Sequence, residues 1–230
     1  IAVAAQAARD RGVPLHAHVS EQPRENDESL AAYGLTPVEV LRDAGALGSH
    51  FTAVHATHLT DGDIGALGGS HVCVCATTER DLADGIGPIP ALRAAGAMLC
   101  LGSDSHAVID PFEEARAIEL DVRLGGRRRG PFPGAEPLAA MTTGGSSALR
   151  LPAVGLAIGA PADFIEVDTA GVRLAGHDPA ALVDALVYAA APGDVRTVVV
   201  AGVERVSGGA HVSIDTAAEL DRAIRQVVGA

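Results

Sequence analysis

Short apolar runs that end in polar residues recur along the first two thirds of the chain. Four of them, at residues 14–19, 51–56, 71–76 and 98–102, have the length and character of buried parallel strands. The segments between these runs show helical periodicity. Strands and helices that alternate in this way predict parallel β/α units.

Helix starts are well marked between these runs. At Thr36 and at Asp110, a capping residue is followed by proline and then by an acidic residue at the third helical position. Thr60 with Asp63 marks another start. Four such units within residues 1–149 amount to half of a (β/α)8 TIM barrel, because a closed barrel takes about 250 residues. The predicted fold class is therefore α/β.

The pattern changes after this half barrel. Residues 155–168 and 196–203 alternate like strands separated by glycine turns. They predict part of a small flanking β-sandwich domain over residues 150–212.

Two helices accompany this β domain. Asp178, followed by proline, predicts an inserted helix over residues 179–191. Thr216 with Glu219 predicts the start of a last amphipathic helix within residues 213–230.

Composition and charge exclude several classes of function. The formal net charge is −12 and there is no tryptophan, so neither a basic patch nor an aromatic platform favours nucleic-acid binding. No apolar run approaches the ~18 to 20 residues that span a membrane, and the opening residues lack the pattern of a signal peptide. The three cysteines lie in apolar runs, which predicts reduced thiols in a cytoplasmic protein.

Two clusters have no function assigned by the sequence. Arg127, Arg128 and Arg129 stand between glycines and predict a solvated loop between helices. Cys73 and Cys75 are expected to point to the same side of a strand. A second cysteine pair that could complete a zinc site with them is absent from the sequence.

The end of the first predicted strand carries residues suited to metal and proton chemistry. His18 ends the run and Glu21 follows three residues later, so both side chains can face one cavity. A neutral imidazole can hold a divalent metal, while a shielded carboxylate can move protons between water and a leaving group. His16 lies on the same side of an ideal strand and is an alternative ligand.

The second and fourth predicted strands end in similar groups. His55 closes the second and can activate water or bind a metal, while His58 in the next loop is a substrate contact or an ordinary solvated histidine. Asp104 closes the fourth, where a carboxylate can bind metal and accept a proton from water. A buried Asp104 requires a metal, a histidine or backbone amides as its partner. Because the carboxyl ends of parallel strands meet at one face, these groups predict a single metal site.

This combination resembles the amidohydrolase superfamily, and within it the deaminase-like branch that uses one metal. The resemblance implies that His18 and Asp104 bind the metal and that Glu21, His55 and Asp104 are catalytic. It implies one divalent metal as cofactor, with zinc as the first choice and iron or manganese as alternatives. The run GAPADF at residues 159–164 is similar to a segment of the small β domain that flanks these barrels.

Three longer stretches, at residues 54–58, 77–86 and 102–106, are similar to the formimidoylglutamate deiminase family. The similarity implies hydrolysis of N-formimidoyl-L-glutamate, a linear amidine of histidine degradation, to N-formyl-L-glutamate and ammonia. In such an enzyme the metal lowers the pKa of bound water and supplies hydroxide at neutral pH. Two alternatives stay open: a related deaminase acting on a cyclic amidine such as guanine, and an inactive half barrel that serves as an interaction fragment.

The resemblance also implies partners for this chain. The superfamily's first strand contributes a His-x-His pair of metal ligands, whereas the strand at residues 14–19 resembles the fifth. We therefore expect an N-terminal half barrel as partner, and expect the chain to be inactive alone. The intact enzyme is expected to bind a small-molecule substrate and to form a homodimer, without nucleic acid or membrane. The roles of His16, His58 and His106 stay open.

Overall fold

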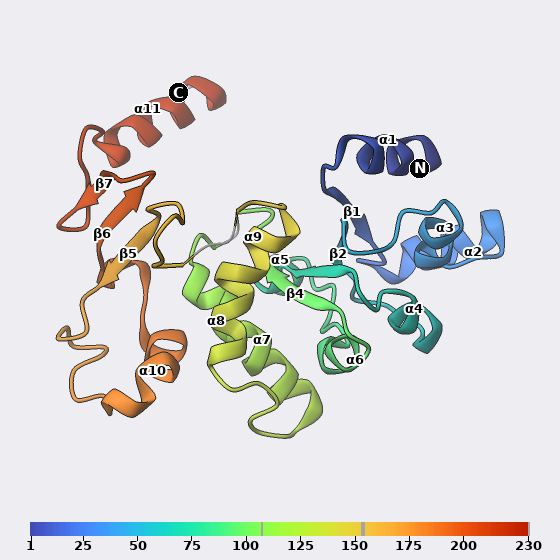
Figure 1. Ribbon diagram of the computed structural model, residues 1–230, viewed down its shortest axis with the longest axis horizontal. Coiled ribbons are helices and arrows are strands. Elements are labelled where there is room, and N and C mark those ends of the chain that lie inside the picture. Colours follow the sequence, from blue (N-terminus) through green and yellow to red (C-terminus); the bar gives the residue numbers. More distant parts are fainter. Residues whose placement is uncertain (107, 153–154, 230) are drawn as a thin grey trace.

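The computed structural model describes residues 1–106, 108–152 and 155–229. Four parallel strands form its first sheet, in the order β1-β2-β3-β4 (Figure 1). Their bounds are β1 Leu15–Val19, β2 Phe51–His55, β3 His71–Val74 and β4 Met98–Leu101. All four predicted strands, and their parallel direction, are thus confirmed.

Helices connect these strands and lie around the sheet (Figure 1). Their bounds are α1 Ala2–Arg11, α2 Pro23–Tyr33, α3 Pro37–Asp43, α4 Asp61–Ala66, α5 Ala76–Asp81, α6 Ile89–Ala94, α7 Pro111–Gly126, α8 Ala135–Ala139, the π-helix η1 Ala140–Gly144 and α9 Gly145–Ala148. Within the described ranges, no helix combines the length and apolar character needed to cross a membrane.

The predicted helix starts are confirmed by their capping contacts. Thr36 and Thr60 each form a capping box at the start of α3 and α4. The Asp110 carboxylate accepts backbone N–H bonds at the start of α7. Asp63 serves two starts at once, because Oδ2 accepts the Thr60 amide at 2.9 Å and Oδ1 accepts the Thr36 hydroxyl at 2.5 Å.

The core lies between the middle strands and the surrounding helices. Phe51 and Ala53 of β2 and Val72 of β3 are completely buried. Burial alternates along β1, where His16 and His18 both face away from this core. Among the described residues, β1 pairs only with β2 and β4 only with β3, so this sheet is open at both edges.

A second sheet, of four antiparallel strands, lies apart from the first with α8 and α9 between them (Figure 1). Its strands are β5 Phe164–Val167, β6 Val195–Val200, β7 Val203–Ser207 and β8 Ala210–His211. The accompanying helices are the 3-10 turn η2 Pro179–Ala181, α10 Leu182–Ala189, the 3-10 turn η3 Pro192–Asp194 and α11 Thr216–Val228.

Two strand predictions in this part are wrong in detail. Residues 155–168 contain only β5, because the segment before it folds into turns. The single strand predicted over residues 196–203 instead comprises most of β6 and the first residue of β7. The chain reverses at Ala201 and Gly202, whose φ angles of 50° and 75° are those of a tight hairpin turn.

The last helix starts one residue earlier than its predicted capping pair implies. Asp215, rather than Thr216, caps α11 and accepts the Ala218 amide at 3.1 Å. The domain boundaries drawn at 150–212 and 213–230 stay predictions, and residues 153, 154 and 230 within them lie outside the described ranges.

Candidate metal centre

The ends of β1, β2 and β4 place polar side chains at one edge of the parallel sheet. In the register of the first pair, Val19 lies opposite His55, so His18 stands one position before it. His55 and Asp104 adopt φ angles of 66° and 45°, in the left-handed region. This backbone costs a non-glycine residue roughly 1–3 kcal/mol and persists only where its surroundings impose it. Such strain is concentrated at functional sites.

His18, His55 and Asp104 converge on one another. Each offers a ligand atom, and these three atoms lie within 4.8 Å of one another. Nε2 of His18 is 3.9 Å from Oδ1 of Asp104, and Nε2 of His55 is 3.7 Å from its Oδ2. The structure therefore brings together residues that the sequence separates by more than eighty positions.

Glu21 reaches the same cluster from the loop after β1. Its Oε1 lies 3.5 Å from Nε2 of His55, and only a quarter of its side chain is exposed. Burial raises the pKa of Glu21, the nearby His55 opposes this rise, and Asp84 adds to it through its charge and a hydrogen bond. A raised pKa favours the protonated carboxyl group, the form that can protonate a leaving nitrogen.

Glu79 hydrogen-bonds the buried His55 side chain through Nδ1, the ring nitrogen that does not face the cluster. Nδ1 of His55 donates to Oε1 of Glu79 at 3.4 Å, and the same oxygen accepts the Cys75 amide at 2.9 Å. Burial lowers the pKa of His55, but the hydrogen bond to Glu79 and the charges of Glu21 and Asp104 outweigh it, so the pKa is raised. With the proton on Nδ1, Nε2 faces the cluster.

The donor set fits a divalent metal. Nε2 of His55 is buried and makes no hydrogen bond within the described chain, although a polar atom in this position ordinarily has a partner. It faces the carboxylate of Asp104, and His18 lies beside it with the two ring centres 5.4 Å apart. The His18 imidazole and the Asp104 carboxylate are ligand types that zinc, iron and manganese accept.

The remaining histidines of the sequence lie elsewhere. His16 donates through Nε2 to the Ala148 carbonyl at 3.1 Å, which ties β1 to α9. His58 donates through Nε2 to the Asp84 carbonyl at 2.7 Å. Neither these two nor the exposed His106 joins the three-residue cluster.

Two acidic residues near the site were not assigned a role from the sequence. Glu79 and Asp84 are both buried, and they contact His55 and Glu21 respectively. Both fall in the stretch 77–86 that carries the family resemblance. Glu79 lies three residues after the predicted strand at 71–76, and Glu21 lies two residues after the one at 14–19. This similar position was a signal by which the sequence could have identified Glu79.

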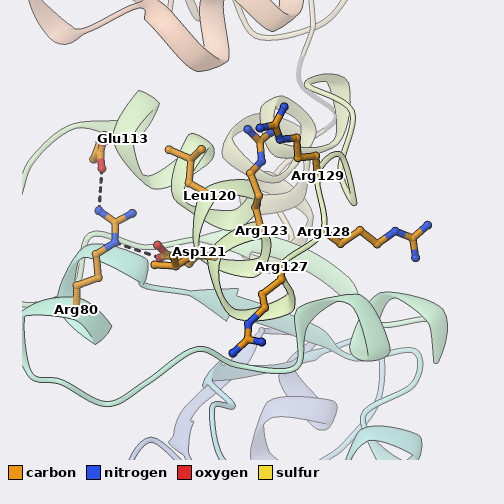
Figure 2. A pocket seen from close by; sticks show the side chains of 9 residues that line it. Arg80, Glu113, Leu120, Asp121, Arg123, Arg127, Arg128 and Arg129 are labelled. Atoms are coloured by element: carbon orange, nitrogen blue, oxygen red, sulfur yellow. Dashed lines mark hydrogen bonds and ion pairs between the residues drawn. The ribbon is translucent and has the colours of Figure 1, made fainter.

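A surface cavity of about 740 Å³ lies away from this cluster, along α7. Figure 2 shows Arg80 on its wall, paired with Glu113 and Asp121 at 2.8 and 3.1 Å. The three consecutive arginines, Arg127 to Arg129, are exposed at the end of α7, and their side chains point in different directions (Figure 2). They do not converge on a common ligand, which agrees with the predicted solvated loop.

Comparison with known proteins decides the family. The amidohydrolase family profile matches residues 1–205. The chain belongs to the amidohydrolase family. Formimidoylglutamate deiminase of Pseudomonas aeruginosa is 34% identical over 232 aligned positions, covering 97% of this chain and 51% of that protein. A 5-methylthioadenosine/S-adenosylhomocysteine deaminase of Pelotomaculum thermopropionicum is 38% identical over 203 positions, covering 85% and 46%.

Solved amidohydrolase structures share this fold. An adenosine deaminase from Xanthomonas campestris with bound zinc superposes with a TM-score of 0.87 at 28% identity, covering 96% of this chain and 51% of that one. The predicted fold class, part of a TIM barrel with a flanking β region, is confirmed by such neighbours. The chain spans about half the length of the curated relatives it matches. In this amidohydrolase the ends of β1 and β2 and the loop after β4 thus bring two imidazoles and two carboxylates together.

Proposed function

We propose that the full-length protein is a metal-dependent amidohydrolase that deiminates N-formimidoyl-L-glutamate to N-formyl-L-glutamate and ammonia. The observation that carries the proposal is the convergence of His18, His55 and Asp104, with Glu21 beside them, at the carboxyl ends of parallel strands. This is the place where barrel enzymes carry their chemistry.

In this proposal His18 and Asp104 hold the metal, for which zinc is the first choice. Two further histidine ligands come from an N-terminal half barrel, which we infer from the half-length match to the relatives. A divalent ion at this place lowers the pKa of water and so provides a nucleophile at neutral pH. The homodimeric state of the intact enzyme stays a prediction.

The protein side chains divide the proton transfers between them. Asp104 accepts a proton of the attacking water, and Glu21 donates its own proton to the imine nitrogen, which gives a tetrahedral carbon bearing a hydroxyl and an amino group. The proton on Asp104 then passes to this amino group, which leaves as ammonia, while the hydroxyl proton returns to Glu21 as the C=O bond forms. His55 orients the water and stabilises charge at the tetrahedral carbon, because its Nε2 lies between the Glu21 and Asp104 carboxylates at 3.5 and 3.7 Å. Burial raises the pKa of Glu21, which favours the protonated form that this donation requires.

A linear amidine substrate is supported by the extent of similarity. The formimidoylglutamate deiminase relative aligns with 97% of this chain, into the second sheet and beyond. Among the described residues, no ion pair of His18, Glu21, His55 or Asp104 involves an arginine, so we expect the substrate's carboxylates to be held by the other half of the barrel.

A ring amidine is the second candidate substrate. The 5-methylthioadenosine/S-adenosylhomocysteine deaminases match at up to 38% identity, somewhat higher than the deiminase, although over less of the chain. The same cluster can serve either reaction, because both displace ammonia from an amidine carbon by water.

The two candidates are separated by steady-state kinetics on the full-length, zinc-loaded protein. We expect kcat/KM for N-formimidoyl-L-glutamate to exceed that for 5-methylthioadenosine and for guanine by at least about 100-fold, since a site built for one substrate's polar groups rejects others strongly. A higher value for either ring compound would replace the linear-amidine proposal with the second candidate.

A further inference from the structure

Three cysteine thiols lie together at the ends of β3 and β4, next to the metal centre. Cys73 of β3 is the register partner of Cys100 of β4, and Cys75 follows β3 directly. The sulfur atoms of Cys73 and Cys75 are 4.0 Å apart, and all three thiols are free. The function proposed above uses none of them.

The position of Gly102 ties the two sulfurs to the strand that carries Asp104. A Cβ added at Gly102 would lie 3.0 Å from Sγ of Cys75 and 3.1 Å from Sγ of Cys73, closer than such atoms normally approach. Any side chain at position 102 would therefore push these sulfur atoms away by a few tenths of an ångström. Asp104 follows two residues later, so the thiol pair lies beside the segment that leads to a proposed metal ligand.

A second connection leads from Cys75 to His55. The Cys75 amide donates to Oε1 of Glu79 at 2.9 Å, and the same oxygen holds Nδ1 of His55 at 3.4 Å. A displacement of Cys75 is thus passed to the carboxylate that orients the catalytic imidazole.

The two thiols differ in reactivity. Hydrogen bonds from Cys100 and Cys75 lower the pKa of Cys73, and Cys73 is partly exposed. Cys75 is buried, and its hydrogen bond to Cys73 and its burial raise its pKa. Cys73 is accordingly the attacking sulfur and Cys75 the resolving one.

We propose that Cys73 and Cys75 form an oxidation site in which a hydroperoxide converts the pair to an intramolecular disulfide that disables the centre. Cys73 sulfur attacks one peroxide oxygen, so an S–O bond forms, the O–O bond breaks and water leaves. Cys75 sulfur then attacks Cys73 sulfur, so the S–S bond forms, the S–O bond breaks and a second water leaves. Two thiols are oxidised by two electrons, and one hydrogen peroxide is reduced to two waters.

Closure requires the sulfurs to approach by about 2 Å, because they are 4.0 Å apart and a disulfide is about 2.05 Å long. That movement shifts Cys75 against Glu79 and against Gly102. We expect ammonia release to fall about ten-fold or more and to recover with dithiothreitol, as for other losses of support around a metal site. The expected loss of ammonia release rests on the proposed function. Formation of the disulfide does not depend on that function and can be measured separately.

The thiol chemistry is tested by mass spectrometry on the full-length, zinc-loaded protein. It is treated with hydrogen peroxide, alkylated with N-ethylmaleimide and digested with trypsin. Between residues 42 and 116 trypsin cleaves only after Arg42, Arg80, Arg93 and Arg116, because this segment has no lysine. Peptide 43–80 therefore carries both Cys73 and Cys75, and peptide 94–116 carries Cys100 alone. The expected product is an unalkylated peptide 43–80 lacking two hydrogen atoms, beside an alkylated peptide 94–116.

Two variants complete the test. Cys100→Ser is the matched control, because it removes the third thiol but keeps a hydroxyl that can donate to Cys73 as the Cys100 thiol does. It is expected to form the same disulfide and to show the same reversible loss of activity relative to its untreated form. Cys75→Ser is expected to form none and to lose the dithiothreitol-reversible part of the inhibition. A cross-link between peptides 43–80 and 94–116, or two alkylated cysteines in peptide 43–80 after peroxide, would overturn the proposal. A protein that forms the disulfide but never releases ammonia would instead count against the proposed function.

Discussion

Nδ1 of His55 and Oε1 of Glu79 lie 3.4 Å apart, which joins the end of β2 to the first turn of α5. Both side chains are buried, and the same oxygen of Glu79 is fixed by the Cys75 amide. The contact keeps the proton on Nδ1 and leaves Nε2 facing Glu21 and Asp104. Glu79 is therefore a positioning residue for the proposed reaction.

Replacing Glu79 by Gln removes the charge that holds His55 in this state. We expect kcat to fall about 10- to 100-fold, with KM and zinc content nearly unchanged. The matched control is Glu114→Gln. Glu114 is a buried carboxylate of α7 that accepts hydrogen bonds from Thr77, a neighbour of Glu79 on α5, and does not contact His55. Equal losses of activity in the two variants would assign Glu79 a purely structural role.

His18 and His55 are expected to separate metal binding from proton chemistry. His18→Asn removes a proposed ligand, so the purified protein should lose zinc together with activity. His55→Asn should retain zinc while kcat falls about 10²- to 10⁴-fold, the range for a positioned proton-transfer group. Metal analysis beside steady-state kinetics distinguishes them. Loss of zinc from the second variant would make His55 a ligand.

The pKa of Glu21 gives a stability prediction with a definite sign. Because burial raises this pKa in the folded protein, the folded state binds the proton more tightly than the unfolded state. The resulting stability is present below the ordinary glutamate pKa and is lost as the pH rises through the raised one. In metal-free protein, Glu21→Gln should therefore raise the urea midpoint near neutral pH and leave it unchanged near pH ~4. A lower midpoint at neutral pH would contradict this account.

Asp63 is expected to stabilise two helix starts through one carboxylate. Asp63→Asn weakens its bonds to Thr36 and Thr60, and should lower the free energy of unfolding by about 1–3 kcal/mol. Asp61→Asn, an exposed acid in the same first turn, is the control and should change stability by less than about 0.5 kcal/mol. Urea unfolding measures both, and similar effects would refute the double-cap role.

The sequence was sufficient for features that depend on neighbouring residues. Thr36 and Asp110 could be identified as helix starts because a cap and its partner lie within four positions. The strands ending near His18, His55 and Asp104 were predicted because parallel strands are short apolar runs with polar ends. Their meeting at one edge follows from parallel pairing.

Other features depend on tertiary contacts that no local pattern encodes. Glu79 becomes a partner of His55 only because α5 folds back beside β2, a contact between residues twenty-four positions apart. The reversal at Ala201 was missed because apolar residues continue through it, and alanine rarely adopts a left-handed backbone. The closeness of Cys73 and Cys75 to Gly102 likewise depends on the pairing of β3 with β4.

Ammonia release from N-formimidoyl-L-glutamate by the full-length protein tests the central claim most directly. It should be measured after metal removal, after zinc is restored, and in zinc-loaded Glu21→Gln. The account predicts that release disappears with the metal and returns with zinc. It also predicts that release falls at least about 10²-fold in the variant while its zinc content is unchanged. Undiminished release without metal, or by the zinc-loaded variant, would contradict it.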